Sequence, residues 1–344
     1  MENTVKTPRL RVAVIGCGRI TEERHAPEYG ACERCEVAGF YDFVPARAEA
    51  LAARYGGVAY PDVEALLADP AVDAVSICTQ NSTHAELTVA ALRAGKHVLC
   101  EKPMATTLAE CETMAEAAKA TGLRLAIAHN QRMMPAHREA RRLVAEGAIG
   151  RVLSFATRFG HSGPDNWSVD RGTGNWFFDK ARSSFGAVAD LGIHKLDLVR
   201  YLLGDDVADV QAAMGTLDKR DAAGNPVSVD DNAVILCRMR GGAIGTVTAS
   251  WTYYAEEEND TTLYGTEGRM DISPAKGLVT VTRAGGESVT YSAPAEATSG
   301  VIDAFVNAVC DGTPSVIDVE ATLPSMRAML AAIGAAERGD RAAL

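Results

Sequence analysis

The sequence lacks a long hydrophobic run and an excess of positive charge, and each absence excludes a class of protein. Its 344 residues carry 34 Lys and Arg against 45 Asp and Glu, which gives a net charge of −11. An acidic chain without a basic block is not expected to bind nucleic acid. No apolar segment approaches the roughly 20 residues that a membrane-spanning helix needs. We therefore expect neither a nucleic-acid partner nor a membrane.

Cysteine is present but too scattered for a metal or disulfide framework. Of the 8 cysteines, only Cys32 and Cys35 are spaced as C-x-x-C, and no second pair of ligands follows at a matching spacing. We predict no metal site. The N-terminal sequence leads from a short apolar stretch into a glycine loop without a secretory signal, so the cytoplasm is the expected location. With 47% apolar and 23% charged residues, the composition is that of an ordinary globular protein,.

The first part of the chain alternates strand-like and helix-like patterns. Short apolar runs predict strands over residues 9–15, 36–41, 73–78, 96–100 and 125–129. Helical patterns lie between them, over residues 45–55, 84–94 and 108–120. Strands separated by helices of this length predict βαβ units in an α/β fold, with a doubly wound parallel sheet.

The pattern changes after residue 134. Strand-like segments now follow one another with few helices between them, at 151–159, 207–217, 233–240, 244–254 and 278–283. Helices are expected over residues 135–146, 187–203, 301–310 and 319–336. This spacing favours a large, mainly antiparallel sheet in a second α/β domain. The length supports two domains, at roughly 150 residues for each.

A glycine loop directly follows the first strand. Gly16 permits a tight turn, and Gly18 lets the backbone approach a pyrophosphate at the start of a helix,. Asp42, at the end of the second strand, can accept hydrogen bonds from ribose hydroxyls and would repel a 2′-phosphate. NAD is therefore expected in preference to NADP, although Arg47 lies close enough in sequence to reach a phosphate. A purely structural turn remains the alternative.

Several motifs together resemble the Gfo/Idh/MocA family of oxidoreductases over nearly the whole chain. They are GCGRI at 16–20, TQNSTH at 79–84, AGKHVLCEKP at 94–103, NQRMMP at 130–135, GAVADLGIHKLDLVRYLLG at 186–204 and YGTEG at 264–268. The resemblance implies an N-terminal Rossmann domain, residues 1–127, that binds NAD(P). It also implies a C-terminal α/β domain, residues 128–344, whose open sheet binds substrate and makes oligomer contacts.

The resemblance also assigns the site. It implies a catalytic trio of Lys102, Asp190 and His194. The cofactor-binding residues are then expected among Gly16, Cys17, Gly18, Arg19, Ile20, Asp42, Thr79, Asn81, His84, Glu101, Lys102 and Gln131. The spacing agrees for one pair, because Asp190 and His194 are four residues apart in a helical segment. Without the resemblance, such a pair is more often a structural hydrogen bond. Phe185 departs from the family's glycine-rich sequence and is expected to narrow the substrate pocket.

Substrate contacts are expected from polar and aromatic residues beyond the first domain. Sugars offer apolar C–H faces to aromatic rings and hydroxyls to polar groups. The candidates are Arg132, His161, Trp167 and Trp176, with a tryptophan pair buried under a loop as the alternative. The leading hypothesis is an NAD-dependent dehydrogenase acting on a sugar, glycoside or cyclitol, active as a homodimer or homotetramer. Two alternatives stay open: tightly bound NAD used for transient oxidation, and a non-catalytic dinucleotide-binding sensor.

Overall fold

A parallel sheet forms the core of the first half of the chain in this computed structural model, which describes residues 9–344. Its order is β3-β2-β1-β4-β5-β6, so the strand sequence reverses between β1 and β4. The strands are β1 (Leu10–Ile15), β2 (Cys35–Tyr41), β3 (Val58–Ala59), β4 (Ala74–Ile77), β5 (His97–Cys100) and β6 (Leu125–Ile127). The segment inspected for a secretory signal begins outside the described residues.

Helices cover both faces of this sheet, as the alternation along β1 requires. Val12 and Val14 point into one buried cluster, and Ala13 and Ile15 point into the other. The helices in chain order are α1 (Ala26–Ala31), α2 (Pro45–Tyr55), α3 (Val63–Ala68), α4 (His84–Arg93) and α5 (Leu108–Thr121). Because both faces are covered, β1 and β4 are mostly apolar and buried almost throughout rather than alternating,. The predicted doubly wound sheet is confirmed.

The second half forms a nine-stranded sheet in the order β14-β13-β12-β11-β7-β10-β9-β8-β15. Its neighbours pair antiparallel except for β7 and β10, which are parallel. The strands are β7 (Val152–Gly160), β8 (Val207–Gly215), β9 (Asn232–Met239), β10 (Ile244–Ser250), β11 (Thr261–Gly265), β12 (Gly268–Ser273), β13 (Leu278–Arg283), β14 (Ser288–Ser292) and β15 (Arg341–Ala343). The mainly antiparallel sheet is thus confirmed, with one parallel pair added.

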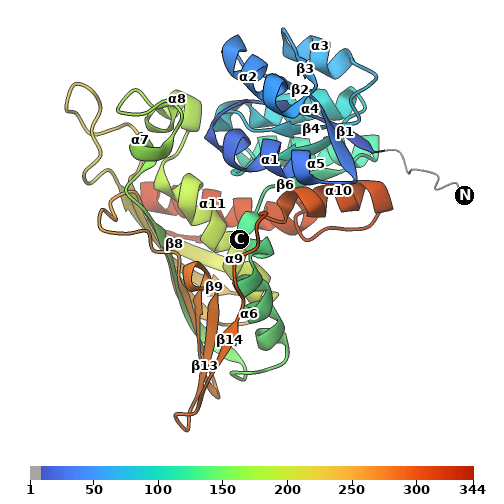
Figure 1. The fold of residues 1–344 in the computed structure, drawn as a ribbon. Coiled ribbons are helices and arrows are strands. Elements are labelled where there is room, and N and C mark those ends of the chain that lie inside the picture. Colours follow the sequence, from blue (N-terminus) through green and yellow to red (C-terminus); the bar gives the residue numbers. More distant parts are fainter. Residues whose placement is uncertain (1–8) are drawn as a thin grey trace, which may run out of the picture.

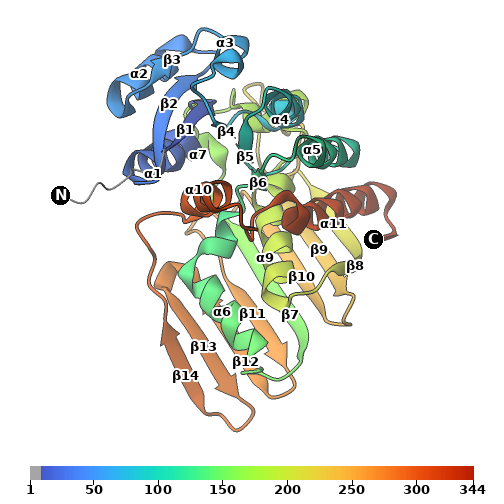
Figure 2. The same ribbon diagram turned by 90° about the vertical axis from the view of Figure 1, so that its right-hand side faces the viewer.

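Only one face of this second sheet carries helices. Figure 2 shows α6 (Pro135–Ala145), α9 (Ile193–Leu203) and α11 (Val319–Arg338) on the near side of the strands. Strand β9 accordingly alternates buried and exposed residues, with Ile235 buried and its neighbour Leu236 48% exposed. The opposite face of the sheet is open (Figure 1).

One helix returns from the C-terminal part of the chain to the first sheet. The apolar residues Val301, Ile302 and Phe305 of α10 (Val301–Asp311) join the buried cluster that holds Val12 and Val14. Residues beyond the expected boundary at 127 therefore contribute to the core of the first unit. A sequence pattern cannot show this, because the contact joins segments about three hundred residues apart.

Two details of the expected elements need correction. The helix expected over 187–203 begins with a π-helical turn, Val188–Gly192, before α9. The strand expected over 244–254 ends at Ser250. Strands β3, β11, β12, β14 and β15 and helix α3 were not expected, because their segments are short or lack a regular alternation. None of the helices within residues 9–344 has the length and apolar character to cross a membrane.

Candidate active site

The glycine loop after β1 has the shape that a phosphate needs. Gly16 has φ +96°, and a Cβ there would lie 2.6 Å from the Cys78 carbonyl oxygen, so the loop is held against the end of β4. At Gly18 a Cβ would meet nothing within 4 Å. The first glycine therefore serves the packing of the loop, and the second leaves open space above the helix that follows.

Asp42 lies at the end of β2 and closes the loop from the side. One carboxylate oxygen accepts a hydrogen bond from the Cys17 backbone N–H at 2.7 Å, and the other accepts one from the Val44 N–H at 2.8 Å. Arg47, which was considered as a phosphate ligand, instead pairs with Asp170 at 2.6 Å. That ion pair joins helix α2 to the loop that lies opposite the Rossmann sheet.

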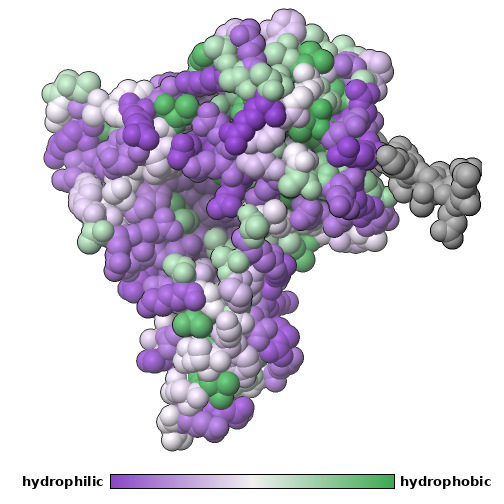
Figure 3. Space-filling model, viewed as in Figure 1, coloured by the Kyte–Doolittle hydropathy of each residue, from purple (hydrophilic) through white to green (hydrophobic). Residues whose placement is uncertain are grey.

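A cavity of about 820 Å³ lies beyond the carboxyl ends of β1, β2, β4 and β5. This volume is within the range of small-molecule sites. Figure 3 shows the surface recessed there, between the Rossmann unit and the arm that carries α7 (Pro164–Trp167) and α8 (Lys180–Ser183). The expected residues on its wall are Gly16, Gly18, Arg19, Ile20, Asp42, Thr79, Asn81, Glu101, Lys102, Asp190, Trp167 and Trp176.

Lys102 and Asp190 meet at the inner end of this cavity. The Lys102 ammonium donates to the Asp190 carboxylate at 2.9 Å and also to the Asp190 backbone oxygen at 2.9 Å. The indole N–H of Trp251 donates to the other carboxylate oxygen at 3.0 Å, and His161 Nε2 lies 3.8 Å from it. Burial acts to raise the pKa of Asp190, whereas the charges of Lys102 and then His161 act to lower it. The net pKa lies below its usual value, so Asp190 is a carboxylate at neutral pH.

His194 lies behind this pair rather than in contact with it. Its ring is 5.9 Å from the Phe159 ring, and its side chain is not part of the cavity wall. No hydrogen bond joins it to Asp190, because the wide π-helical turn at Val188–Gly192 rotates the carboxylate out of the usual i, i+4 alignment,. Burial and the Lys102 charge hold the pKa of His194 well below its usual value. A neutral imidazole can accept a proton.

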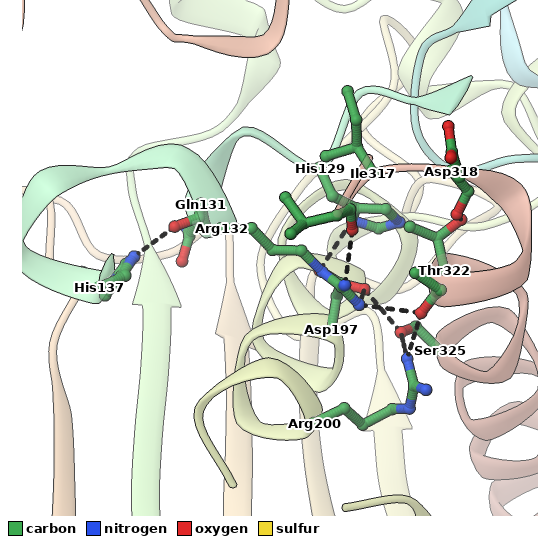
Figure 4. A network of polar contacts seen from close by, with 12 residues as sticks. His129, Gln131, Arg132, His137, Asp197, Arg200, Ile317, Asp318, Thr322 and Ser325 are labelled. Carbon is green, nitrogen blue, oxygen red and sulfur yellow. Dashed lines mark hydrogen bonds and ion pairs between the residues drawn. The ribbon is translucent and has the colours of Figure 1, made fainter. Parts of the chain in front are cut away.

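Four of the expected contact residues lie away from the cavity wall. Cys17 is fully buried, and His84 bonds the Pro103 and Thr79 backbone oxygens at 2.8 and 3.1 Å. Gln131 donates to Asn259 at 3.1 Å. Arg132 is held by Asp197 at 2.6 and 2.7 Å (Figure 4), so in this structure it is not free to meet a substrate.

An aromatic arm covers the cavity from the side of the second sheet. Trp176 stacks on Phe177 with ring centroids 3.8 Å apart, and Trp167 packs edge-on against the same ring at 5.2 Å. Next to the arm, a second hollow of about 490 Å³ is lined by His161, Trp167, Tyr253, Tyr254 and other residues. Thus three of the four expected substrate residues, His161, Trp167 and Trp176, line the cavity or the second hollow, and Trp167 lines both.

Sequence reasoning missed Trp251 as a partner of Asp190. The sequence placed it on a strand with Tyr253 and indicated core or interface. It is indeed fully buried, yet its one polar atom reaches the carboxylate. Arg182 was also missed; it lines the cavity and donates to Gln80 at 2.8 Å. Neither residue is part of a motif, and only the folding of distant segments brings Trp251 to Asp190 and Arg182 to the cavity.

These features fit a dinucleotide. Gly16 and Gly18 shape the loop, Asp42 ends the second strand, and the cavity follows the strand ends to a Lys–Asp pair. Ligands of open α/β sheets bind at this place, where the strand order reverses. Fold and site together define a dinucleotide-binding oxidoreductase.

Comparison with known proteins identifies the family. Residues 10–129 match the oxidoreductase family with an NAD-binding Rossmann fold, and residues 137–271 match the GFO/IDH/MocA C-terminal domain. A 1,5-anhydro-D-fructose reductase from Ensifer adhaerens is 33% identical over 315 residues, which are 89% of this chain and 90% of that protein. The chain belongs to the Gfo/Idh/MocA family of oxidoreductases.

Two further relatives are similar in sequence or structure. A levoglucosan dehydrogenase from Pseudarthrobacter phenanthrenivorans is 34% identical over 227 residues, covering 61% of this chain and 57% of that enzyme. A solved levoglucosan dehydrogenase in complex with NADH and levoglucosan superposes with a TM-score of 0.87 at 26% identity. That superposition covers 98% of this chain and 99% of the other. The expected family and enzyme class are thereby confirmed.

Proposed function

We propose that this protein oxidises a secondary alcohol of a sugar, glycoside or cyclitol, or reduces the corresponding ketone, with NAD. The single observation that carries the proposal is the Lys102–Asp190 pair at 2.9 Å, located at the inner end of a cavity that starts at the glycine loop. The aromatic arm supplies apolar faces, and the adjoining hollow supplies polar groups, as a carbohydrate requires. Relatives named for levoglucosan and anhydrofructose support this substrate class.

Three residues divide the work on the substrate. Bound NAD supplies the acceptor for a hydride from the carbinol carbon. Lys102 points into the cavity, where its charge stabilises negative charge that develops on the substrate oxygen. His194 takes the hydroxyl proton, since its lowered pKa keeps it neutral and able to accept,. Asp190 holds the Lys102 ammonium in place by accepting two hydrogen bonds from it, one at the carboxylate and one at the backbone oxygen.

NAD in preference to NADP is part of the same proposal. Asp42 presents a carboxylate on the cavity wall, and Arg47 is already paired with Asp170 at 2.6 Å. A 2′-phosphate would therefore meet negative charge from Asp42 and a guanidinium that is already neutralised. Calorimetry should find tighter binding of NAD than of NADP. Tighter NADP binding would assign Arg47 to the phosphate and remove this part of the proposal.

Assembly into a homodimer or homotetramer is proposed through the open face of the second sheet. Large apolar side chains on β9, β10 and β11 are exposed there: Val234 (49%), Leu236 (48%), Ile244 (52%) and Tyr264 (44%). An apolar patch of this kind on a sheet is typical of an interaction surface. Light scattering should give at least twice the 36.4 kDa chain mass. A monomeric mass at micromolar concentration would contradict it.

A panel of sugars, glycosides and inositols, scored by NADH absorbance, tests the central proposal. At least one member should reduce NAD, and the Lys102→Ala variant should lose that activity. A second reading is favoured by similarity to an aldose–aldose oxidoreductase from Caulobacter crescentus, at 26% identity and a TM-score of 0.85. In that case NAD would stay with the purified protein and no net NADH would appear. A chain that binds NAD but converts no panel member in either way would instead be a sensor.

A further inference from the structure

Two buried histidines face each other behind the Lys102–Asp190 pair, and neither has its polar atoms satisfied. His129 follows β6, and His194 is on α9; their rings are perpendicular, with centroids 6.4 Å apart. Both ring nitrogens of His129 and the Nδ1 atom of His194 are buried without a hydrogen-bond partner among residues 9–344. Buried polar atoms without a hydrogen-bond partner lower the stability of the fold, so each of them calls for an explanation.

Asp197 settles which nitrogen of His129 carries a proton. It lies three residues after His194 on α9, and its Oδ2 is 3.6 Å from His129 Nδ1. The carboxylate accepts two hydrogen bonds from Arg132 and one from Ser325, and it can only accept (Figure 4). The nearby nitrogen is then Nδ1–H, and Nε2 is left as a lone-pair acceptor.

The lone pair on His129 Nε2 in turn favours one tautomer of His194. No hydrogen bond joins the two rings in this structure, but with the proton on the buried Nδ1 of His194, the facing His129 ring offers its Nε2 as the acceptor, and Nε2 of His194 is left as the base. We propose that His129 is a positioning residue for His194, which links it to Asp197 and keeps its Nε2 free to take the substrate proton. Distances in a structure without ligand are often long and tighten when substrate binds.

The charged groups around both rings determine whether the proton taken from the substrate stays on His194 or moves on to His129. His194 is surrounded by Lys102 beyond β5, His129 beyond β6, and Lys195 on its own helix, with Asp190 one turn before it. His129 is next to Asp197 and Arg132, with Lys102 and Glu101 further away. Burial lowers the pKa of His129 to about 4 despite the Asp197 charge. His129 thus accepts a hydrogen bond but not the proton, which stays on His194.

The variant His129→Phe tests this, because it keeps a ring and removes both nitrogens. With a substrate found in the panel, we expect kcat to fall about tenfold to a hundredfold, as when outer partners of a functional histidine are removed. KM and NAD affinity should stay as in the wild type. The acidic limb of the pH–rate profile should move to lower pH, because the His194 imidazolium loses its acceptor. His129→Gln, with an amide in that place, should recover part of the rate.

His137→Phe is the matched control. His137 is also fully buried, its pKa is lowered to about 3 mainly by burial, and its Nε2 likewise has no partner among the described residues. It bonds the Gln131 backbone oxygen at 2.7 Å and makes no contact with the His194 ring. A merely structural role predicts the same modest change for both variants. Equal kcat loss in both, or an acidic limb that does not move in His129→Phe, would overturn the proposal.

The inference rests on the proposed function, and His194→Ala separates the two. Full turnover in His194→Ala would contradict the proposed function itself. An inactive His194→Ala together with a wild-type His129→Phe would contradict only the role of His129. If His129→Phe does not fold, His129→Asn replaces it, since its shorter side chain does not reach His194. The same loss of kcat and the same shift of the acidic limb are then expected, and their absence would overturn the proposal.

Discussion

Asp190 and Asp197 stand seven residues apart on one helical segment, and both are paired with a cation, yet their surroundings differ. Asp190 holds Lys102 at the wall of the cavity, and the side chain of Lys102 is 16% exposed. Asp197 holds Arg132 in a closed region, where the two side chains are 2% and 6% exposed. A flexible ammonium next to open space can turn to a substrate, whereas a buried guanidinium that makes four hydrogen bonds cannot,.

Arg132 in the closed region makes four hydrogen bonds, whereas Lys102 at the cavity makes two. Arg132 donates to both carboxylate oxygens of Asp197 and also to the backbone oxygens of Val316 and Ala321, at 2.8 and 3.0 Å. These bonds tie η3 (Asn130–Met133) and α9 to α11 and to the segment before it (Figure 4). The comparison shows that the cation of a buried ion pair can act on a substrate only when it also borders open space, as Lys102 does and Arg132 does not.

The largest effect is expected from Arg132→Ala. It would leave the Asp197 carboxylate buried without its counter-charge, which typically costs about 3–5 kcal/mol of unfolding free energy. Urea denaturation would measure it. Arg142→Ala is the control, since its pairs with Glu139 and Glu146 are exposed and should leave stability unchanged. An Arg132→Ala protein as stable as this control would show that the Arg132–Asp197 pair does not stabilise the fold.

The cavity pair should respond in rate rather than in stability. Lys102→Ala removes the charge that stabilises the substrate oxygen, and turnover should fall by about 10²–10³, as for the loss of one oxyanion donor. NAD affinity should persist, because the glycine loop and Asp42 are at the other end of the cavity. Steady-state kinetics and calorimetry on the same preparation measure both. Wild-type turnover in this variant would place the chemistry elsewhere.

The free energy of unfolding is expected to depend on pH through His137, which lies beside the closed region. Burial lowers the pKa of His137 to about 3, from an ordinary value of 6.5. Between these values the unfolded chain binds a proton that the folded chain refuses, so stability is full above pH 6.5 and is lost as pH falls. The slope for one such group is about 1.4 kcal/mol per pH unit. His137→Phe should reduce the slope of unfolding free energy between pH 4 and 6 by that amount; an unchanged slope would contradict it.

The smallest effect is expected at Trp251. Its indole N–H donates to Asp190 at 3.0 Å and sets the orientation of the carboxylate that holds Lys102. Trp251→Phe keeps a buried ring and removes this donor. A hydrogen bond to a charged group is worth roughly 1.5 kcal/mol, so we expect about a tenfold fall in kcat. A fall in kcat as large as that of Lys102→Ala would contradict this, because it would exceed the contribution of one hydrogen bond.

Much of this comparison was within reach of the sequence. The apolar runs, the helical patterns and the motifs around Gly16, Lys102 and Asp190 predicted both sheets and the pair at the cavity. Asp197 was already interpreted as structural. The resemblance placed Lys102 and Asp190 in one site, and the structure joins them at 2.9 Å. Local pattern was sufficient here, because each of these residues follows directly from a strand end or a helix face.

What the sequence missed depends on contacts between distant segments. Arg132 was expected to touch substrate, because it follows a strand that points to the cleft, but Asp197 and α11 hold it in the closed region. Trp251 reaches Asp190 only because β10 lies under the π-helical turn. Strands β11 and β12 were missed because they are only 5 and 6 residues long and each carries just two apolar side chains. No short-range signal carries these facts.

The central claim is that His194, which lies behind the Lys102–Asp190 pair, takes the substrate proton. The most direct measurement is the rate of NADH appearance in His194→Ala, with NAD affinity determined on the same protein. We predict a fall of about 10²–10⁴ in turnover, the usual worth of a positioned acid–base group, with NAD affinity retained. Unchanged turnover by a folded His194→Ala protein on a confirmed substrate would contradict the claim.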